Sequence, residues 1–431
     1  MAAIPTVPPH MLPAPNICIR DLVQFPLPLI AQDLHNPSLL EGRNISAVFL
    51  KNEPTWNERH DVVTIEVPVD KLLKRFVKAW TKAIQAGARS VRVCHTAVSC
   101  AETLPMWIVP YWQGVAAARK HQERWQSVEL FLMRPHNSWW DPRGERSSVA
   151  AVMRAALEML YQRSSNEMLQ GFADPEPIER LAAFASHDWL STWHMDLQLE
   201  LLKRDLARAG KHQILVPMSY FYKSLLDAFN DKDQYGDPKF HQTVLKFGVR
   251  IVHHNFDLAT VANVDENHWI AFIICRRHET VYYGDSMGNR VHSQFFEVIN
   301  WWIFFHFARA FEWATMSMSK QADWFSCGIL GGNGLRHFFL SRLYPLAAEG
   351  EWGADAERGD VLAQILLQDR VRRAFFGSHT LLLIPSPQFN PFFTVRFSVP
   401  PFSRNHHLQS CAWSPMRKLW RWRAKSPESC I

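Results

Sequence analysis

Hydrophobic positions near the N-terminal end of the chain follow first a strand-like and then a helical period. Residues 62–67 alternate between apolar and polar side chains, which indicates a half-buried strand. Asp70 then precedes a stripe of apolar residues at helical spacing that stops near Gly87, so we expect a helix that Asp70 caps. The stripe consists of Leu72, Leu73, Phe76, Val77, Trp80 and Ile84.

The segments that follow repeat this mixture of strand and helix. Residues 90–94 have the pattern of a short strand, and residues 105–133 and 147–163 have the pattern of helices. We therefore expect an α+β region over residues 41–165. It contains no motif that carries chemistry, so it is interpreted either as a recruiting or partner-binding domain or as an extension packed on the rest of the protein.

Apolar runs in the C-terminal half predict two adjacent strands. A polar residue begins the first strand, and another ends the second. His268 begins a strand that runs through residues 270–274, and Asp285 ends the strand that follows. A turn near residues 276–279 joins the two strands. The start of one strand and the end of the next then lie at the same edge of a sheet, which places His268 beside Asp285.

Cys327 is the candidate nucleophile. It precedes a glycine and a long apolar stretch, so we expect it to open a helix whose N-terminal dipole favours a thiolate. His268 would take the thiol proton, and Asp285 would fix the imidazole tautomer. The amide of Gln321 and the backbone N–H of Cys327 are the candidate donors to an oxyanion.

Each of these residues also has an ordinary structural interpretation. A single cysteine is more often a small buried hydrophobic residue than a nucleophile. Asp285 fits a turn residue before Ser286, and Gln321 alone fits a surface amide. Their occurrence in the order His, Asp, Gln, Cys favours a catalytic constellation.

This order resembles the Ulp1/SENP class of ubiquitin-like-protein proteases and, more broadly, the adenain-type cysteine peptidases. The resemblance covers residues 175–385 and rests on four places. They are Asp188-Trp189-Leu190 with the apolar helix that follows, His268-Trp269 with its strand, Tyr282-Tyr283-Gly284-Asp285-Ser286, and Gln321 six residues before Cys327. The resemblance implies an α+β, papain-like or adenain-like cysteine protease fold, with a central mixed sheet and the nucleophile at the N-terminus of a helix.

The resemblance also implies a function. It predicts a cysteine protease that cleaves peptide or isopeptide bonds after the C-terminal glycine of a ubiquitin-like modifier (SUMO, Nedd8 or ubiquitin), through a thioester and without a cofactor. Trp189 and Trp269 match two family tryptophans that enclose an extended Gly-Gly terminus, where flat walls exclude residues with side chains. Packing in the core is the alternative role for both tryptophans.

The sequence departs from the family pattern at three places. Family members that process SUMO often carry an acidic residue shortly after the entry tryptophan, where this chain has Ser191 and Thr192. Ser326 stands where an aspartate commonly precedes the nucleophile. Residues 331–334 contain three glycines, each of which costs about 1 kcal/mol relative to alanine in a helix interior. The first departure puts SUMO specificity in question, and the last requires that tertiary packing hold the helix.

The composition predicts an intracellular globular protein, nuclear or cytoplasmic. The chain of 431 residues is 47% hydrophobic and 20% charged, enough for one or two cores. Its seven cysteines show neither a disulfide framework nor the spacing of metal ligands, so no metal is expected. The first 30 residues lack the pattern of a signal peptide, and the aromatic run at residues 301–305 is too short to span a membrane.

Both ends of the chain differ in composition from the middle. Residues 1–40 are rich in proline, and we expect an extended, mostly disordered leader. Residues 386–431 contain further prolines and then five cations interleaved with two tryptophans over residues 417–425. With the net charge of +6, this segment is interpreted as a solvated tail, a nuclear address, or a contact for nucleic acid or an acidic membrane surface.

Two other classes of function fit the same residues. A protein acyltransferase can use a His-acid-Cys arrangement, but it needs a site for acetyl-coenzyme A, and Trp269 disfavours this alternative. A catalytically decayed binding module, derived from a mobile element or not, is the second alternative. The complete set of His268, Asp285, Gln321 and Cys327 argues against decay.

Overall fold

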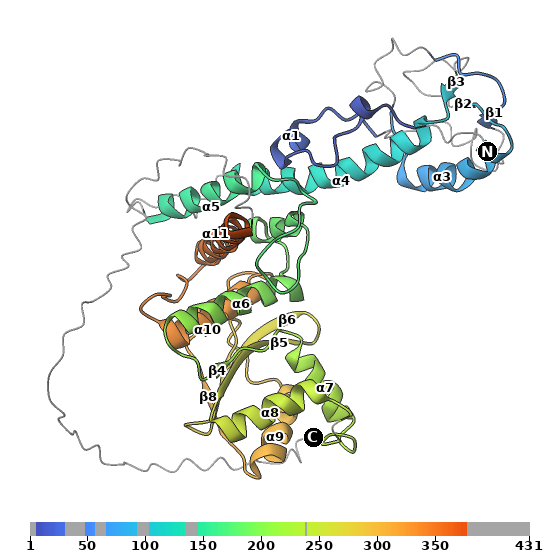
Figure 1. Cartoon of the computed structure of the whole chain (residues 1–431). Helices are drawn as coiled ribbons and strands as arrows, with labels where there is room; N and C mark the ends of the chain where they lie inside the picture. Colours follow the sequence, from blue (N-terminus) through green and yellow to red (C-terminus); the bar gives the residue numbers. More distant parts are fainter. Residues whose placement is uncertain are drawn as a thin grey trace, which may run out of the picture. The chain divides into compact units, whose positions relative to one another are not determined.

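The computed structural model describes residues 6–30, 48–56, 66–92, 103–133, 145–237 and 239–376. The chain divides into two units, Met1–His379 and Thr380–Ile431, and the second lies outside the described residues, as does the predicted basic segment within it. The first unit contains a three-stranded and a five-stranded sheet with helices around them (Figure 1). No described helix has both the length and the apolar character that a membrane crossing needs.

The N-terminal part of the first unit is a small antiparallel sheet covered by helices. Its sheet has the order β1-β2-β3, and Val91 of β2 pairs with Phe49 of β1 and Leu104 of β3. The elements are the 3-10 helix η1 (Pro9–Met11), α1 (Ile19–Gln24), β1 (Phe49–Leu50), α3 (Asp70–Gln85), β2 (Ser90–Arg92), β3 (Thr103–Pro105), α4 (Ile108–Met133) and α5 (Glu145–Tyr161).

The predicted amphipathic helix is present as α3, but its cap differs from the prediction. Phe76 is fully buried, and its ring lies 5.6 Å from that of Trp112 in α4, measured between centroids. The N-cap residue is Val69, and no side chain caps the helix. The predicted Asp70 cap is therefore wrong, because the chain is extended only up to Val69 and Asp70 is already helical. Its carboxylate still lies in the first turn, where the helix dipole favours a negative charge.

Part of the proline-rich leader is folded, which corrects the prediction of a mostly disordered segment. Ile19 and Leu22 of α1 are buried in the same core as residues of α4 and α5. The side-chain amide of Gln122 in α4 donates to the carbonyl oxygens of Leu22 (2.8 Å) and Phe25 (2.7 Å). The prolines limit regular structure between these contacts, but they do not prevent the apolar residues among them from being buried.

The structure tests the other N-terminal predictions only in part. Residues 62–65 and 93–94 of the two predicted strands lie outside the described residues, and Val67 forms an isolated parallel bridge with Ile30. The helix predicted from residue 105 begins at Ile108, because Pro105 pairs with Ser90 in the sheet. The second predicted helix is α5.

The C-terminal part of the first unit is built around the five-stranded sheet, in the order β4-β5-β6-β7-β8. The two inner pairings are antiparallel and the two outer ones parallel, so the predicted mixed sheet is confirmed. The elements are η4 (Ile178–Ala185), α6 (Thr192–Arg208), β4 (Ile214–Leu215), α7 (Phe221–Asn230), α8 (Gln242–His254), β5 (Asp257–Val264), β6 (His268–Cys275), β7 (Thr280–Gly284), α9 (Ser293–Phe307), β8 (Glu312–Thr315), α10 (Cys327–Leu340) and α11 (Glu351–Phe376).

Helices cover both faces of this sheet, α6 and α10 on one and α7, α8 and α9 on the other (Figure 1). Alternate residues of β6 join the two cores. Ala271 and Ile273 belong to the core with α6 and α10, whereas Phe272 and Ile274 belong to the core with α7, α8 and α9. Burial on both faces explains why the strand reads as an unbroken apolar run instead of an alternating pattern.

The glycines of α10 allow this helix to lie close to its neighbours. A Cβ atom on Gly332 would lie 2.1 Å from the Oε1 atom of Gln198 in α6, and one on Gly328 would lie 3.3 Å from Cδ1 of Trp269 in β6. The helix is continuous in spite of its glycines. Its low helix propensity is therefore offset by close packing, as the sequence required. Gly331 differs, because the nearest atom to its Cβ position, from Val261, is 3.9 Å away.

This difference predicts opposite effects for two adjacent substitutions. Gly331→Ala has room for its methyl group and should raise the free energy of unfolding by up to about 1 kcal/mol, because alanine favours the helix. Gly332→Ala must displace the buried Gln198 side chain and should lower the free energy of unfolding by about 1–3 kcal/mol. Urea denaturation followed by circular dichroism measures both. Equal destabilisation by the two variants would contradict the close approach at Gly332.

Candidate active site

The pairing of β6 with β7 brings two of the predicted residues together. His268 is the first residue of β6, and Asp285 directly follows β7. The strands are antiparallel, with Ala271 opposite Gly284, so these two ends meet at one edge of the sheet. The Nε2 atom of His268 lies 2.8 Å from the Oδ1 atom of Asp285, within hydrogen-bond distance. The Nδ1 atom of the imidazole therefore remains for another partner.

The carboxylate of Asp285 is held from several sides. The backbone N–H of Met287 donates to its Oδ1 atom (2.7 Å), and the hydroxyl of Tyr283 donates to its Oδ2 atom (3.3 Å). Burial alone would raise the pKa of Asp285, but the hydrogen bonds from His268, Met287 and Asn289 lower it below its ordinary value. Asp285 is thus kept ionised and oriented toward His268.

Cys327 opens α10, as predicted, and lies against His268. Its thiol lies near enough to the His268 imidazole to help raise the pKa of that ring, and the residue is 2% exposed. The thiol is at the N-terminus of a helix of 14 residues, where the dipole favours a negative charge. Because Nε2 of His268 faces Asp285, Nδ1 is the ring nitrogen left to serve the thiol of Cys327. The structure thus brings Cys327, His268 and Asp285 into one chain of contacts.

The protonation of His268 follows from these contacts. Burial disfavours the imidazolium, but the hydrogen bonds with Asp285 and Cys327 outweigh it and raise the pKa of His268 to about 9. An imidazole with this pKa is protonated at neutral pH. That state is the one a thiolate–imidazolium pair requires.

Asp323 shapes the loop before the nucleophile, a role that was not predicted. Its carboxylate accepts hydrogen bonds from the backbone N–H groups of Phe325 (2.9 Å) and Ser326 (2.8 Å) and from the hydroxyl of Ser326 (2.7 Å). An aspartate that bonds to N–H groups two and three residues later is the signature of a local turn, so the sequence contained the signal. Ser326, which stands where the family commonly has an aspartate, is thus itself bonded to an aspartate.

Gln321 links the two halves of the site. Its Oε1 atom accepts a hydrogen bond from the hydroxyl of Ser286 (2.7 Å), the residue after Asp285. Its Nε2 atom donates to the carbonyl oxygen of Asp323 (2.7 Å) in the loop before Cys327. One of the two amide hydrogens is therefore used within the loop, and the other is the one that can serve a ligand.

The two tryptophans that were predicted to enclose the Gly-Gly terminus differ in exposure. Trp189 is 51% exposed, whereas Trp269 is 4% exposed. The indole Nε1 atom of Trp269 donates to the carbonyl oxygen of Leu190 (2.9 Å), the residue after Trp189. Trp269 thus fixes the segment that carries Trp189 to the start of β6.

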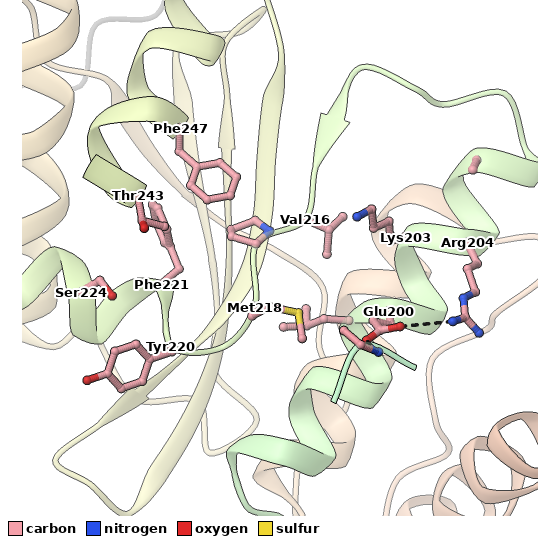
Figure 2. A pocket seen from close by; sticks show the side chains of 14 residues that line it. Glu200, Lys203, Arg204, Val216, Met218, Tyr220, Phe221, Ser224, Thr243 and Phe247 are labelled. Carbon is pink, nitrogen blue, oxygen red and sulfur yellow. Dashed lines mark hydrogen bonds and ion pairs between the residues drawn. The ribbon is translucent and has the colours of Figure 1, made fainter. Parts of the chain in front are cut away.

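A separate pocket lies between α6, the loop after β4, α7 and α8 (Figure 2). Its volume is about 950 Å³, and none of the six predicted site residues lines it. Glu200 and Arg204 form an ion pair of 3.2 Å on its α6 side, and Phe221 and Phe247 lie on the opposite side. The pocket borders the helix that follows the Trp189 segment, but it does not include the thiol.

Comparisons with known proteins find similarity in the C-terminal part of the first unit. Residues 188–330 match the model of the Ulp1 protease family, C-terminal catalytic domain. The structure is similar to that of the C-terminal Ulp1 protease domain in complex with Smt3, the yeast ortholog of SUMO, at 16% sequence identity and a TM-score of 0.39, over 51% of this chain and 95% of that chain. It is also similar to the Chaetomium thermophilum Ulp1-like SUMO protease catalytic domain, at 16% identity and a TM-score of 0.36, over 53% and 90% of the two chains. No curated protein matches the sequence.

The raised pKa of His268 predicts a specific pH dependence. The folded-state pKa of about 9 lies above the ordinary value of 6.5, so the contacts of His268 stabilise the fold fully below about pH 6.5 and lose this effect as the pH rises through about 9. Asp285→Asn should move the pKa of His268 down toward 6.5 and weaken this dependence. NMR titration of the histidine rings measures the shift.

His194 provides the internal control for that titration. Burial lowers the pKa of this histidine to about 4, and its ring nitrogens bond to Ser191 and to the carbonyl oxygen of Arg180. Asp285→Asn should leave the titration of His194 unchanged. A His268 pKa near 6.5 in the wild-type protein would contradict the contacts described here.

Proposed function

We propose that the protein is a cysteine-type peptidase that hydrolyses peptide or isopeptide bonds after the C-terminal glycine of a ubiquitin-like modifier. The match of residues 188–330 to the model of the Ulp1 protease family, C-terminal catalytic domain, supports this proposal. The observation that carries the proposal is the chain of contacts from Asp285 through His268 to Cys327 at the start of α10. A thiol, an imidazole and a carboxylate in this order are the components of nucleophilic acyl transfer.

Acylation begins with the thiolate of Cys327. Protonated His268 holds it, and the thiolate attacks the carbonyl carbon of the terminal glycine to form a tetrahedral intermediate. The Nδ1 proton of His268 then passes to the leaving amine, and the C–N bond breaks to leave a thioester. Asp285 remains ionised throughout, holds Nε2 and stabilises the imidazolium between these steps.

The oxyanion of each tetrahedral intermediate needs fixed donors. The backbone N–H of Cys327 has no partner within the helix at this first position, and the second amide hydrogen of Gln321 lies in the adjoining loop. We assign these two groups to the oxyanion. In the second half of the reaction, neutral His268 takes a proton from water, which attacks the thioester and releases the modifier.

The identity of the modifier depends on the segment after Trp189. Ser191 caps α6, and its hydroxyl lies 2.8 Å from Nδ1 of His194, whose side chain also accepts from the Ser191 backbone N–H (3.1 Å). This reciprocal cap occupies a position near which SUMO-processing relatives often carry a carboxylate. We infer a SUMO-like modifier. At this segment the modifier would make contacts between uncharged groups, and it would not pair a basic residue with an acidic one of the enzyme.

Covalent labelling tests the proposal. Purified wild-type protein is treated with SUMO, Nedd8 and ubiquitin that carry a thiol-reactive electrophile at the C-terminus, and the mass shift is measured. We expect one modifier class to label wild-type protein and Cys275→Ala, a control at another buried cysteine, but not Cys327→Ala. A folded wild-type protein that no modifier labels would refute the proposed activity.

The role of Gln321 has its own test. Gln321→Ala should lower kcat by about 100-fold or more with a smaller effect on KM, because an oxyanion donor acts mainly in the transition state. Ser286→Ala is the matched control, since it removes the hydroxyl that bonds to Oε1 of Gln321 but leaves both amide hydrogens. Equal losses of kcat in the two variants would assign Gln321 to loop structure instead.

A further inference from the structure

One buried arginine contacts both segments that flank the candidate active site. Arg358 of α11 is fully buried, and its guanidinium donates to the carbonyl oxygen of Phe325 (3.0 Å) and to that of Asp188 (3.2 Å). Phe325 lies two residues before Cys327, and Asp188 directly precedes Trp189. A third hydrogen bond goes to the carbonyl oxygen of Ala183 at the end of η4 (2.8 Å).

A second set of contacts joins the same two segments. The ring of His187 stacks on the ring of Phe325, with 4.4 Å between centroids and 23° between planes. Nε2 of His187 lies 3.6 Å from Oδ1 of Asp355, which is on α11 one turn before Arg358. The guanidinium carbon of Arg358 is 5.5 Å from the centroid of Phe325. The Trp189 segment, the loop before Cys327 and α11 therefore meet at a single cluster.

The charge of Arg358 fits this position better than an apolar side chain would. Its acceptors are backbone carbonyl oxygens, which an apolar residue would leave without a donor. Asp355, which is 2% exposed, and Asp323 lie close enough to interact with the charge. A buried cation is costly unless such partners surround it, so its presence here calls for a specific role.

The helix that carries Arg358 is fixed at its other end. Asp369 of α11 is fully buried and accepts hydrogen bonds from Arg163 (2.8 Å), from Arg373 (2.8 Å) and from the backbone N–H of Gln170 (2.6 Å). The helix also contacts α5, η4, α6 and α10. Arg358 therefore projects from an element whose own position is set by both parts of the unit.

We propose that Arg358 is a positioning residue, which holds the Trp189 segment and the Cys327 loop at a fixed separation and so sets the alignment of the modifier terminus with the nucleophile. This inference rests on the proposed peptidase function. It extends the active site beyond residue 330, where the family match ends, to a helix that includes residue 358. Arg358 does not touch the reacting atoms; it acts through the backbone of the residues beside them.

The test compares four variants of the full chain with wild-type protein. Arg358→Lys keeps the charge but cannot make the same set of hydrogen bonds, and Arg358→Met removes both. Arg336→Lys and Arg336→Met are matched controls, because Arg336 is also buried (1% exposed) but lies on α10 near Asp205 and Tyr344. The readouts are hydrogen–deuterium exchange of peptides over residues 187–195 and 321–328, kcat and KM on a modifier precursor, and alkylation of Cys327 by iodoacetamide.

We expect exchange to rise in both peptides together in the Arg358 variants, less in Lys than in Met. Hydrolysis of the precursor should fall about 100-fold in kcat/KM for Arg358→Met, as expected for a displacement of about 1 Å at the reacting atoms. Alkylation by iodoacetamide should change far less, because a small reagent needs only the thiolate and no aligned substrate. A general loss of folded protein would instead raise exchange throughout the chain and lower hydrolysis in proportion to the unfolded fraction.

Three results would overturn the proposal. They are unchanged exchange of both peptides in folded Arg358→Met, equal effects of the Arg336 and Arg358 substitutions, and failure of both Arg358 variants to fold while the Arg336 variants fold. The exchange experiment needs no substrate. If no modifier reacts with the wild-type protein, the peptidase function fails, but the coupling of the two segments through Arg358 is still decided.

Discussion

The candidate site depends on the close approach of α10 to β6 and α6. A thiol at the start of a helix can bond to an imidazole at the start of a strand only if the helix backbone lies near the sheet. Gly328 and Gly332 permit that approach, since a Cβ atom at either position would meet Trp269 or Gln198 at short distance. The same glycines weaken the helix in isolation. In α10, close packing against β6 and α6 therefore decides these two positions, at a cost in helix propensity.

Charge at the site is controlled by pairing more than by burial. His194 and His268 show the difference, because burial dominates at His194 and lowers its pKa to about 4, whereas Asp285 and Cys327 raise that of His268 to about 9. One ring is thus a neutral structural element, and the other is a protonated ring beside Cys327. At Arg358 burial lowers the pKa, although neighbouring carboxylates oppose this effect and backbone carbonyl oxygens accept from its guanidinium.

The boundary expected between residues 41–165 and 175–385 does not separate two units, because residues 1–379 form a single unit. The contact of α11 with α5 explains why. Asp369 joins Arg163 at the end of the N-terminal part to a helix that also reaches Phe325 beside the nucleophile. The α5 helix of the N-terminal part therefore supports α11, the helix whose Arg358 contacts the loop before Cys327. A linker between independent domains would not transmit such support.

The sequence by itself determined the local parts: strands of unbroken apolar residues, a helix opened by Cys327, and the ends of β6 and β7 that bring His268 to Asp285. These follow from periodicity and short-range connection, which a single sequence records. Tertiary structure alone decided the role of Arg358 and the burial of Ile19. Arg358 joins Phe325, 33 residues before it, to Asp188, 170 residues before it, and Ile19 is buried in a core with residues of α4 and α5. No local pattern indicates which distant carbonyl oxygens a buried arginine bonds to. Nor does it indicate which apolar residues of a proline-rich segment pack against a helix.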